Sequence, residues 1–286
     1  MNSEKNKTVG ATLYLVATPI GNLADITERA VKVLTEVDFI AAEDTRNSLK
    51  LLTCLGIKNE LVSYHEHNKA AAGERIVARL LSGESCALIT DAGMPAISDP
   101  GEDLVRLCSN AGVRVAVVPG ACAAVSALAL SALSTSKFVF EGFLPANKTQ
   151  RKKALSSLIN ETRTIIFYEA PHKLLATLCD MKEAFGSERR ISLCRELTKL
   201  NEEVIRVDLG KACEMYSEKE PRGEYVLIVE GAGEATSEEA TFPADPEEHV
   251  KLYEAMGQKR MDAIKSAAKD RGISKSDLYK ILLQNS

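Results

Sequence analysis

The sequence contains no tryptophan, and only 5% of its 286 residues are aromatic. A binding surface built mainly from stacked aromatic side chains is therefore not indicated. No apolar run approaches the roughly 20 residues that a membrane-spanning helix needs. The first ten residues, MNSEKNKTVG, are polar and lack the apolar segment of a signal peptide. We expect a cytoplasmic protein that does not enter a membrane.

Closely spaced cysteine pairs are also missing. The seven cysteines form no C-x-x-C pair, and several lie in apolar segments. This spacing predicts buried thiols in a reducing compartment rather than disulfides or a zinc site. His65 and His67 would face the same side of a strand, but no third ligand lies nearby. We predict no metal site, and a polar cleft lining for these histidines.

Short apolar runs alternate with amphipathic segments from Ala11 onward, a pattern typical of an α/β fold. Near-continuous apolar strands predict a parallel sheet in the first half, and short connections predict a mixed sheet in the second. The strands are expected at Thr12–Ala17, Phe39–Ala42, Leu61–Tyr64, Ala87–Thr90, Val113–Val118, Phe138–Gly142, Thr164–Tyr168, Arg190–Cys194, Glu203–Asp208 and Glu224–Glu230. Helices are expected at Glu74–Leu81, Glu102–Asn110, Arg151–Leu158, His172–Phe185 and Met261–Lys269, with a small-residue helix after Gly120.

The length predicts about two domains, and a composition change marks a third part. We place an N-terminal α/β domain at residues 11–120 and a second α/β domain at residues 121–231. We predict an acidic linker at residues 232–247, because this stretch contains Gly, Pro and Ser together with several acidic residues and no basic one. Residues 248–286 show only helix signals and predict a small helix-turn-helix-like domain.

The C-terminal part is basic, although the whole chain has a formal net charge of −4. From Lys259 to Ser286, seven basic residues stand against three acidic ones. Ser274, with Asp277 three positions later, predicts a capping box at the start of the last helix. A helical hairpin packed on the body is the alternative interpretation, but the charge favours contact with nucleic acid.

Two Asp-x-Gly elements follow the strand that ends at Thr90: Asp91-Ala92-Gly93 and Asp99-Pro100-Gly101. Glycine lets the backbone approach a ligand, and an aspartate can hold an amine or a hydroxyl. Open α/β sheets bind ligands at the carboxyl ends of their strands. Similar loops, Pro19-Ile20-Gly21 and Pro119-Gly120, follow two other strands. Asp99 is better explained as a helix cap.

Polar clusters follow further strands. Glu43, Asp44 and Arg46 provide a possible general base and an anion clamp. By residue type alone, however, Asp44 or Thr45 as a helix N-cap with Arg46 solvated is the favoured interpretation. Residues 144–153 form a polar loop entering a helix with four basic residues, which suits contact with a phosphate backbone. Residues 168–172 and 195–199 also bring charged groups to strand ends.

These segments resemble one known family. TPIGNLADIT, AAEDTR, HEHN, ITDAGMPAISDPG, VPGACAAVSAL, EGFLP, FYEAPHKL, CRELTK and GEYVLIVEG occur in the order found in the tetrapyrrole-methylase-like superfamily. More closely, they resemble its branch that methylates the ribose 2′-hydroxyl of a cytidine in 16S rRNA of the 30S ribosomal subunit. The resemblance runs from about Thr12 to Gly231, and the helical tail resembles that branch's terminal domain. It implies a homodimer of chains with two α/β domains, S-adenosylmethionine in the cleft between those domains, and no metal.

The resemblance also implies site residues. The cofactor loops carry over to Pro19, Ile20, Gly21, Asp91, Ala92, Gly93, Met94, Pro95, Ile97, Cys122, Ala123, Tyr168 and Leu197. The family usually has Thr where this chain has Met94, and Pro where it has Ala121. We expect cofactor binding to survive both changes, because much of the contact is with the backbone.

The choice of catalytic base stays open among Asp44, Glu43 and His65. Candidate RNA contacts are Arg46, Lys148, Arg151, Lys152, Lys153, Lys199, Lys259, Arg260 and Lys275. Two alternatives remain: a small-molecule (tetrapyrrole-type) methyltransferase, and a ligand-sensing DNA-binding regulator.

Overall fold

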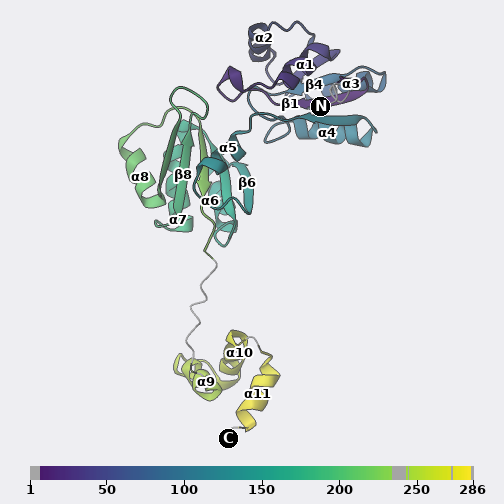
Figure 1. Ribbon diagram of the computed structural model, residues 1–286. Helices are drawn as coiled ribbons and strands as arrows, with labels where there is room; N and C mark the ends of the chain where they lie inside the picture. The colour runs from purple at the N-terminus through teal and green to yellow at the C-terminus, as the bar shows by residue number, and fades with distance from the viewer. Residues whose placement is uncertain (1–6, 234–242, 244, 272, 285–286) are drawn as a thin grey trace. The chain divides into compact units, whose positions relative to one another are not determined.

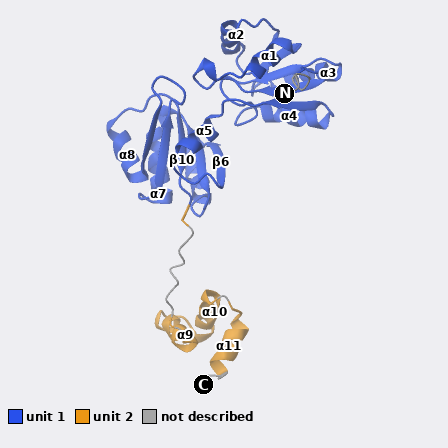
Figure 2. Ribbon diagram, viewed as in Figure 1, with its two compact units in different colours: residues 1–231 blue, residues 232–286 orange. Residues whose placement is uncertain are grey.

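The computed structural model describes residues 7–233, 243, 245–271 and 273–284. The chain forms two compact units, residues 1–231 and residues 232–286 (Figure 2). Most of the predicted acidic linker, residues 234–242 and 244, lies outside the described residues. Both α/β sheets belong to the first unit (Figure 1).

The first sheet is parallel throughout and has the strand order β3-β2-β4-β1-β5. Its strands are β1 (Thr12–Val16), β2 (Phe39–Ala42), β3 (Leu61–Ser63), β4 (Cys86–Ile89) and β5 (Arg114–Val118). Because successive side chains point to opposite faces, Leu13 joins the apolar core under α3 and α4, whereas Tyr14 joins the core under α1 and α2. The helices are α1 (Glu28–Glu36), α2 (Thr45–Cys54), α3 (Lys69–Leu81) and α4 (Gly101–Asn110), with a short 3₁₀ helix at Leu23–Asp25.

The second sheet is mixed, with the order β6-β7-β10-β8-β9. Strands β6 and β7 are parallel, and the other neighbours are antiparallel. Its strands are β6 (Phe138–Phe143), β7 (Thr164–Glu169), β8 (Arg190–Arg195), β9 (Glu203–Asp208) and β10 (Tyr225–Val229). Helix α5 (Ala123–Leu130) covers one face. Helices α6 (Lys148–Ser157), α7 (Pro171–Phe185) and α8 (Leu209–Glu218) cover the other. The predicted parallel and mixed sheets are confirmed.

One predicted RNA contact belongs to the framework of this second sheet. Arg151 is buried, and its Nε and Nη2 both lie 2.7 Å from Asp180 Oδ2 on α7. Its Nη1 donates to the carbonyl oxygens of Pro145 and Ala146. In this structure Arg151 is engaged within the fold, because helix α6 turns the guanidinium inward against a buried carboxylate. Its predicted contact with RNA would require this ion pair to break.

The second unit contains three helices in its described residues: α9 (Pro246–Ala255), α10 (Arg260–Asp270) and α11 (Lys275–Gln284). They enclose a small apolar core of their own that includes Val250, Ile264 and Leu278. Ser274 caps α11, since the Asp277 amide donates to Ser274 Oγ (3.1 Å), and the Asp277 carboxylate accepts from the Ser274 hydroxyl (2.6 Å). Helix α9 begins inside the stretch that composition assigned to the linker.

Candidate functional site

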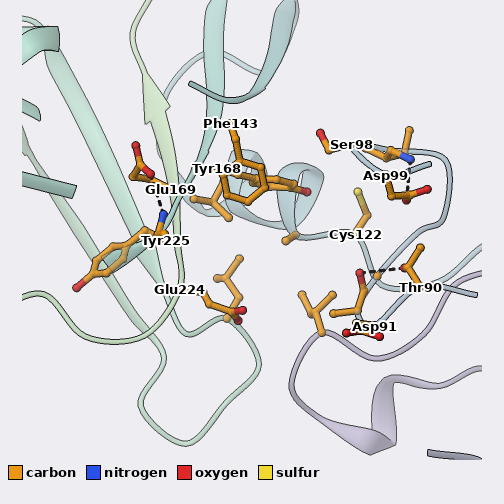
Figure 3. A pocket seen from close by; sticks show the side chains of 18 of the residues that line it. Thr90, Asp91, Ser98, Asp99, Cys122, Phe143, Tyr168, Glu169, Glu224 and Tyr225 are labelled. Carbon is orange, nitrogen blue, oxygen red and sulfur yellow. Dashed lines mark hydrogen bonds between the residues drawn. The ribbon is translucent and has the colours of Figure 1, made fainter. Parts of the chain in front are cut away.

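A pocket of about 570 Å³ lies among loops that follow strands of both sheets (Figure 3). Strand β10 runs antiparallel to β7 and β8, so its first residues reach the same edge as the ends of those strands. The lining residues are Ile20, Glu43, Thr90, Asp91, Ala92, Gly93, Met94, Ile97, Ser98, Asp99, Cys122, Ala123, Phe143, Tyr168, Glu169, Ala170, Pro171, His172, Cys194, Leu197, Lys199, Glu224, Tyr225 and Val226.

Backbone hydrogen bonds join two of these loops. The Thr18 amide donates to the Gly93 carbonyl (2.9 Å), and the Gly93 amide donates to the Thr18 carbonyl (3.1 Å). Gly93 has a φ of 86°, and a Cβ atom there would lie 3.2 Å from Ile20 Cγ2. A side chain at position 93 would therefore strain the backbone and crowd the adjoining loop. Backbone atoms of these two loops therefore form part of the pocket wall.

Asp99 holds the next part of the wall. Its carboxylate accepts hydrogen bonds from the amides of Ala96 (2.9 Å), Ile97 (3.3 Å) and Gly101 (2.7 Å). Ala96 and Ser98 have φ values of 66° and 63°, so the loop is kept in a conformation that side-chain-bearing residues rarely adopt. The predicted cap is displaced by one residue: Pro100 is the N-cap of α4, and Asp99 bonds the first helical amide from the preceding position.

Five acidic side chains line the pocket, and four of them are bonded to neighbours. These bonds join Asp91 Oδ2 to Asn47 Nδ2 (3.0 Å), Asp99 to the amides of Ala96, Ile97 and Gly101, Glu169 Oε2 to Thr177 Oγ1 (2.5 Å), and Glu224 Oε2 to Lys199 Nζ (2.8 Å). The excess of carboxylates suits a ligand that carries positive charge.

Glu43 is the exception. This half-buried side chain makes no hydrogen bond or ion pair with any residue that the structure describes. Burial raises the pKa of its carboxyl group, and the negative charges of Asp91 and Asp99 raise it further, while His65 opposes the shift. An unengaged carboxylate with a raised pKa is suited to accept a proton from a ligand.

The other two candidate bases do not line the pocket. Asp44 caps α2, accepting from the Arg46 amide (2.8 Å), and the Arg46 guanidinium also holds its carboxylate. These bonds lower the pKa of Asp44 to about 2, which makes it a poor proton acceptor. The helix-cap interpretation of Asp44 is confirmed. His65 Nδ1 is buried and has no hydrogen-bond partner among the described residues.

The predicted cofactor residues all line the pocket except Pro19, Gly21 and Pro95. Gly21 instead packs against the loop after β8, where a Cβ would lie 3.0 Å from Thr198 Oγ1. Sequence reasoning assigned no role to Phe143, Glu169, His172 or the start of β10. The polar cluster at residues 168–172 did indicate that Glu169 and His172 lie at a strand end. The position of β10 at the same edge could not be predicted, because it depends on the order of strands in the sheet.

The predicted RNA contacts differ in how free they are. Lys148, Lys153, Lys259 and Lys275 are exposed and make no ion pair within the described ranges. Lys152 pairs with Glu183, and Lys199 bridges Glu196 and Glu224 at the pocket. Arg260 pairs with Glu247 and Glu254.

In the described part of the chain, no group of three or more His, Cys, Asp or Glu side chains is arranged to hold a metal ion. Nor is any helix there both long and apolar enough to cross a membrane. All seven cysteines are free thiols.

Residues 12–213 match the family described as Tetrapyrrole (Corrin/Porphyrin) Methylases, and the chain belongs to that family. Among its relatives, the Ribosomal RNA small subunit methyltransferase I of Halalkalibacterium halodurans is 50% identical over 275 residues, covering 96% of this chain and 95% of the relative. The Bacillus subtilis protein of the same name is 46% identical over 270 residues, covering 93% and 92%. The fold resembles that of uroporphyrin-III C-methyltransferase from Thermus thermophilus complexed with S-adenosylhomocysteine, with a TM-score of 0.54, 16% identity, and coverage of 77% of this chain and 92% of that one.

Proposed function

We propose that this protein transfers a methyl group from S-adenosylmethionine to the ribose 2′-hydroxyl of a cytidine in 16S rRNA of the 30S subunit. The observation that carries the proposal is near-full-length similarity, at 43–50% identity, to proteins named Ribosomal RNA small subunit methyltransferase I. The pocket supports it, because an acid-rich cleft with one unengaged carboxylate suits a cationic methyl donor and a proton transfer.

The pocket residues fit the cofactor. Its volume falls within the range of about 300–1,000 Å³ that small-molecule sites occupy. Gly93 and the strained loop held by Asp99 bring backbone groups to the wall, so Met94 in place of the family's Thr leaves these backbone contacts in place. We infer that Ile20, residues 91–94, Ile97, Cys122, Ala123, Tyr168 and Leu197 hold S-adenosylmethionine. When bound, the cofactor supplies an activated methyl group on a positively charged sulfur.

Within this proposal, Glu43 is the base. Its carboxylate would accept the proton that leaves the ribose 2′-hydroxyl. The oxygen would form its bond to the methyl carbon as the bond from that carbon to the cofactor sulfur breaks, and S-adenosylhomocysteine would leave. Asp91, which is bonded only to Asn47 among the described side chains, presents its second carboxylate oxygen to an amine or hydroxyl of the cofactor. The walls position the two reacting groups, and positioning is the main source of rate for an in-line transfer of this kind.

RNA contact is assigned to the free cations. Lys148 and Lys153 on α6, and Lys259 and Lys275 in residues 248–286, have exposed charges with no ion-pair partner within the described ranges. Their charges suit phosphate groups. Arg46, Lys152, Lys199 and Arg260 would first have to leave carboxylates of this chain.

We further propose a cytoplasmic homodimer. Large apolar side chains are exposed on the edge strand β5 (Val117) and on α5 (Val125 and Leu130). Such apolar exposure marks association surfaces. Sedimentation analysis of the purified chain tests this part, and a monomer at micromolar concentration would contradict it.

The activity is tested by incubating the protein with labelled S-adenosylmethionine and, separately, unmodified 30S subunits, free 16S rRNA and a tetrapyrrole. Label is expected at a cytidine 2′-O-methyl group in the 30S or 16S sample. Label in the tetrapyrrole alone would support the small-molecule alternative. Binding of specific duplex DNA without methyl transfer would support a regulator.

A further inference from the structure

Strand β6 contains an irregularity immediately before the pocket. Its register against β7 shifts between Phe140 and Gly142, so that Phe140 pairs with Ile166 and Phe143 pairs with Tyr168. Gly142 has a φ of 64°, a left-handed conformation that few residues other than glycine adopt. Glu141 is the extra residue of this bulge. Bulges of this kind occur beside active sites, where they redirect a side chain.

The bulge determines which face Phe143 occupies. In a regular strand, residues 140 and 143 would point to opposite faces. Here they pair with Ile166 and Tyr168, which share a face, so both phenylalanines lie on that face. Both rings pack edge-on against Tyr168, with centroid separations of 5.1 Å for Phe140 and 5.4 Å for Phe143. Phe143 is thereby directed into the pocket lining (Figure 3).

Phe143 is nevertheless 59% exposed in this chain of few aromatics. Ile97, which also lines the pocket, is 44% exposed. The two chain segments approach each other closely, since a Cβ on Gly142 would lie 2.9 Å from Ser98 Oγ. Two large apolar side chains of the pocket lining, one at the end of β6 and one in the neighbouring loop, thus remain exposed. A flat, apolar-faced group would cover them.

We propose that Phe143 is the platform on which a nucleobase of the RNA stacks, holding the nucleotide so that its ribose reaches the pocket. This inference rests on the proposed function. Every base has a π-face, and proteins that bind unpaired RNA stack such bases on aromatic side chains. Phe143 is a positioning residue, with no part in the proton transfer.

The lysines that succeed Phe143 in the chain favour RNA over the cofactor as the occupant. Five residues after Phe143, α6 begins with Lys148, and Lys153 lies about one and a half turns further along. Both lysines are exposed and make no ion pair in the described part of the chain. A nucleotide on Phe143 brings phosphates for these cations, whereas S-adenosylmethionine has none. Strand end and helix start therefore offer a base contact and phosphate contacts on one continuous segment.

The test compares Phe143→Ala with Phe143→Trp and with Phe138→Ala. Phe138 is a matched control, because it is 43% exposed on the same strand but does not line the pocket. Measurements are the KM and kcat for unmodified 30S subunits, the Kd for S-adenosylhomocysteine by calorimetry, and the fluorescence of a single-stranded oligoribonucleotide carrying pyrrolocytosine. Stacking worth about 1–3 kcal/mol per base predicts a KM raised roughly 5- to 150-fold in Phe143→Ala. Phe143→Trp should keep the KM close to that of the unaltered protein, because tryptophan also offers a ring on which a base can stack.

S-adenosylhomocysteine affinity should stay within about twofold in all three variants, and the fluorescence quenching on binding should disappear only in Phe143→Ala. If Phe143→Ala instead weakens S-adenosylhomocysteine and leaves the KM for 30S subunits unchanged, Phe143 belongs to the cofactor site and the proposal is wrong. If Phe143→Ala matches Phe138→Ala in every measurement while the unaltered protein methylates RNA, the platform is wrong and the proposed function stands. An unaltered protein that neither binds nor methylates RNA would overturn both.

Discussion

Glu43 and Asp44 are adjacent in the chain, yet their carboxyl groups differ sharply in availability. The Asp44 carboxylate accepts hydrogen bonds from the backbone amide and the guanidinium of Arg46. Glu43 lines the pocket without a hydrogen-bond or ion-pair partner among the described residues. We predict that Glu43→Gln slows methyl transfer by about 100-fold or more, the usual contribution of a general base. S-adenosylhomocysteine affinity should not change. Single-turnover rates with saturating RNA check this, with Asp44→Asn expected to retain most of the activity.

The same carboxyl group predicts a pH dependence. Burial raises the pKa of Glu43, as do the carboxylates of Asp91, Asp99 and Asp44, and His65 opposes them. Because only the deprotonated base accepts a proton, the rate should rise with pH through a pKa above that of an ordinary glutamate and then level off. In Glu43→Gln that rise should be absent. An identical pH profile in the variant would assign the titration to another group.

Asp91 is predicted to bind the cofactor without supporting the fold. Its side chain is exposed, and Asn47 is the only side chain that bonds it in the described part of the chain. Hydrogen bonds to charged groups are worth about 1.5–3 kcal/mol, so Asp91→Ala should weaken S-adenosylhomocysteine binding roughly tenfold or more while the unfolding midpoint is kept. Asn47→Ala is the control, because it removes the same bond but leaves the carboxylate. Equal losses in both variants would mean that Asp91 acts by ordering α2.

At the scale of elements, the ion pair between α6 and α7 carries a stability prediction. Arg151 and Asp180 are both buried, so Arg151→Ala leaves a buried carboxylate unpaired. The free energy of unfolding should fall by about 3–5 kcal/mol, and the double variant Arg151→Met, Asp180→Leu should recover most of it. Denaturant titration measures both. The neighbouring exposed pair provides the control, and Lys152→Ala should change stability little. A stable Arg151→Ala protein that fails to bind RNA would return Arg151 to the RNA contacts.

Elements whose signal is local were predictable from the sequence. Strand β2 has the predicted bounds, and Ser274 caps α11 as predicted, because burial pattern and cap chemistry depend on nearby residues. Helix α3 begins at Lys69, five residues before the predicted Glu74. The consecutive alanines at its start give no alternation of apolar and polar residues from which a helix face could be recognised. The bulge in β6 and the antiparallel position of β10 beside β7 depend on which strands pair. The residues within one strand do not reveal its partners. Likewise, the unengaged state of Glu43 required the positions of all its neighbours.

At the scale of the whole molecule, we predict that the first unit binds the cofactor and that the second unit adds RNA contacts to those of the first. The pocket is formed entirely by residues of the first unit, and the second unit has its own apolar core. Removing residues 232–286 should therefore leave the first unit folded, with its affinity for S-adenosylhomocysteine intact. The same deletion should weaken binding to 30S subunits. Calorimetry and filter binding at several salt concentrations measure the two effects.

Charge, rather than the mere presence of the helices, should account for that loss. Lys259, Lys265, Lys269 and Lys275 are exposed, and none forms an ion pair within the described residues. Each phosphate contact contributes about 0.7–0.9 to the slope of log affinity against log salt concentration, so changing all four lysines to glutamine should reduce the slope by up to about 3.6. This variant keeps the apolar core, and its helices should melt as before. An unchanged salt slope in the quadruple variant would show that these lysines do not contact RNA. If the deletion of residues 232–286 also abolished cofactor binding, the second unit would instead stabilise the first.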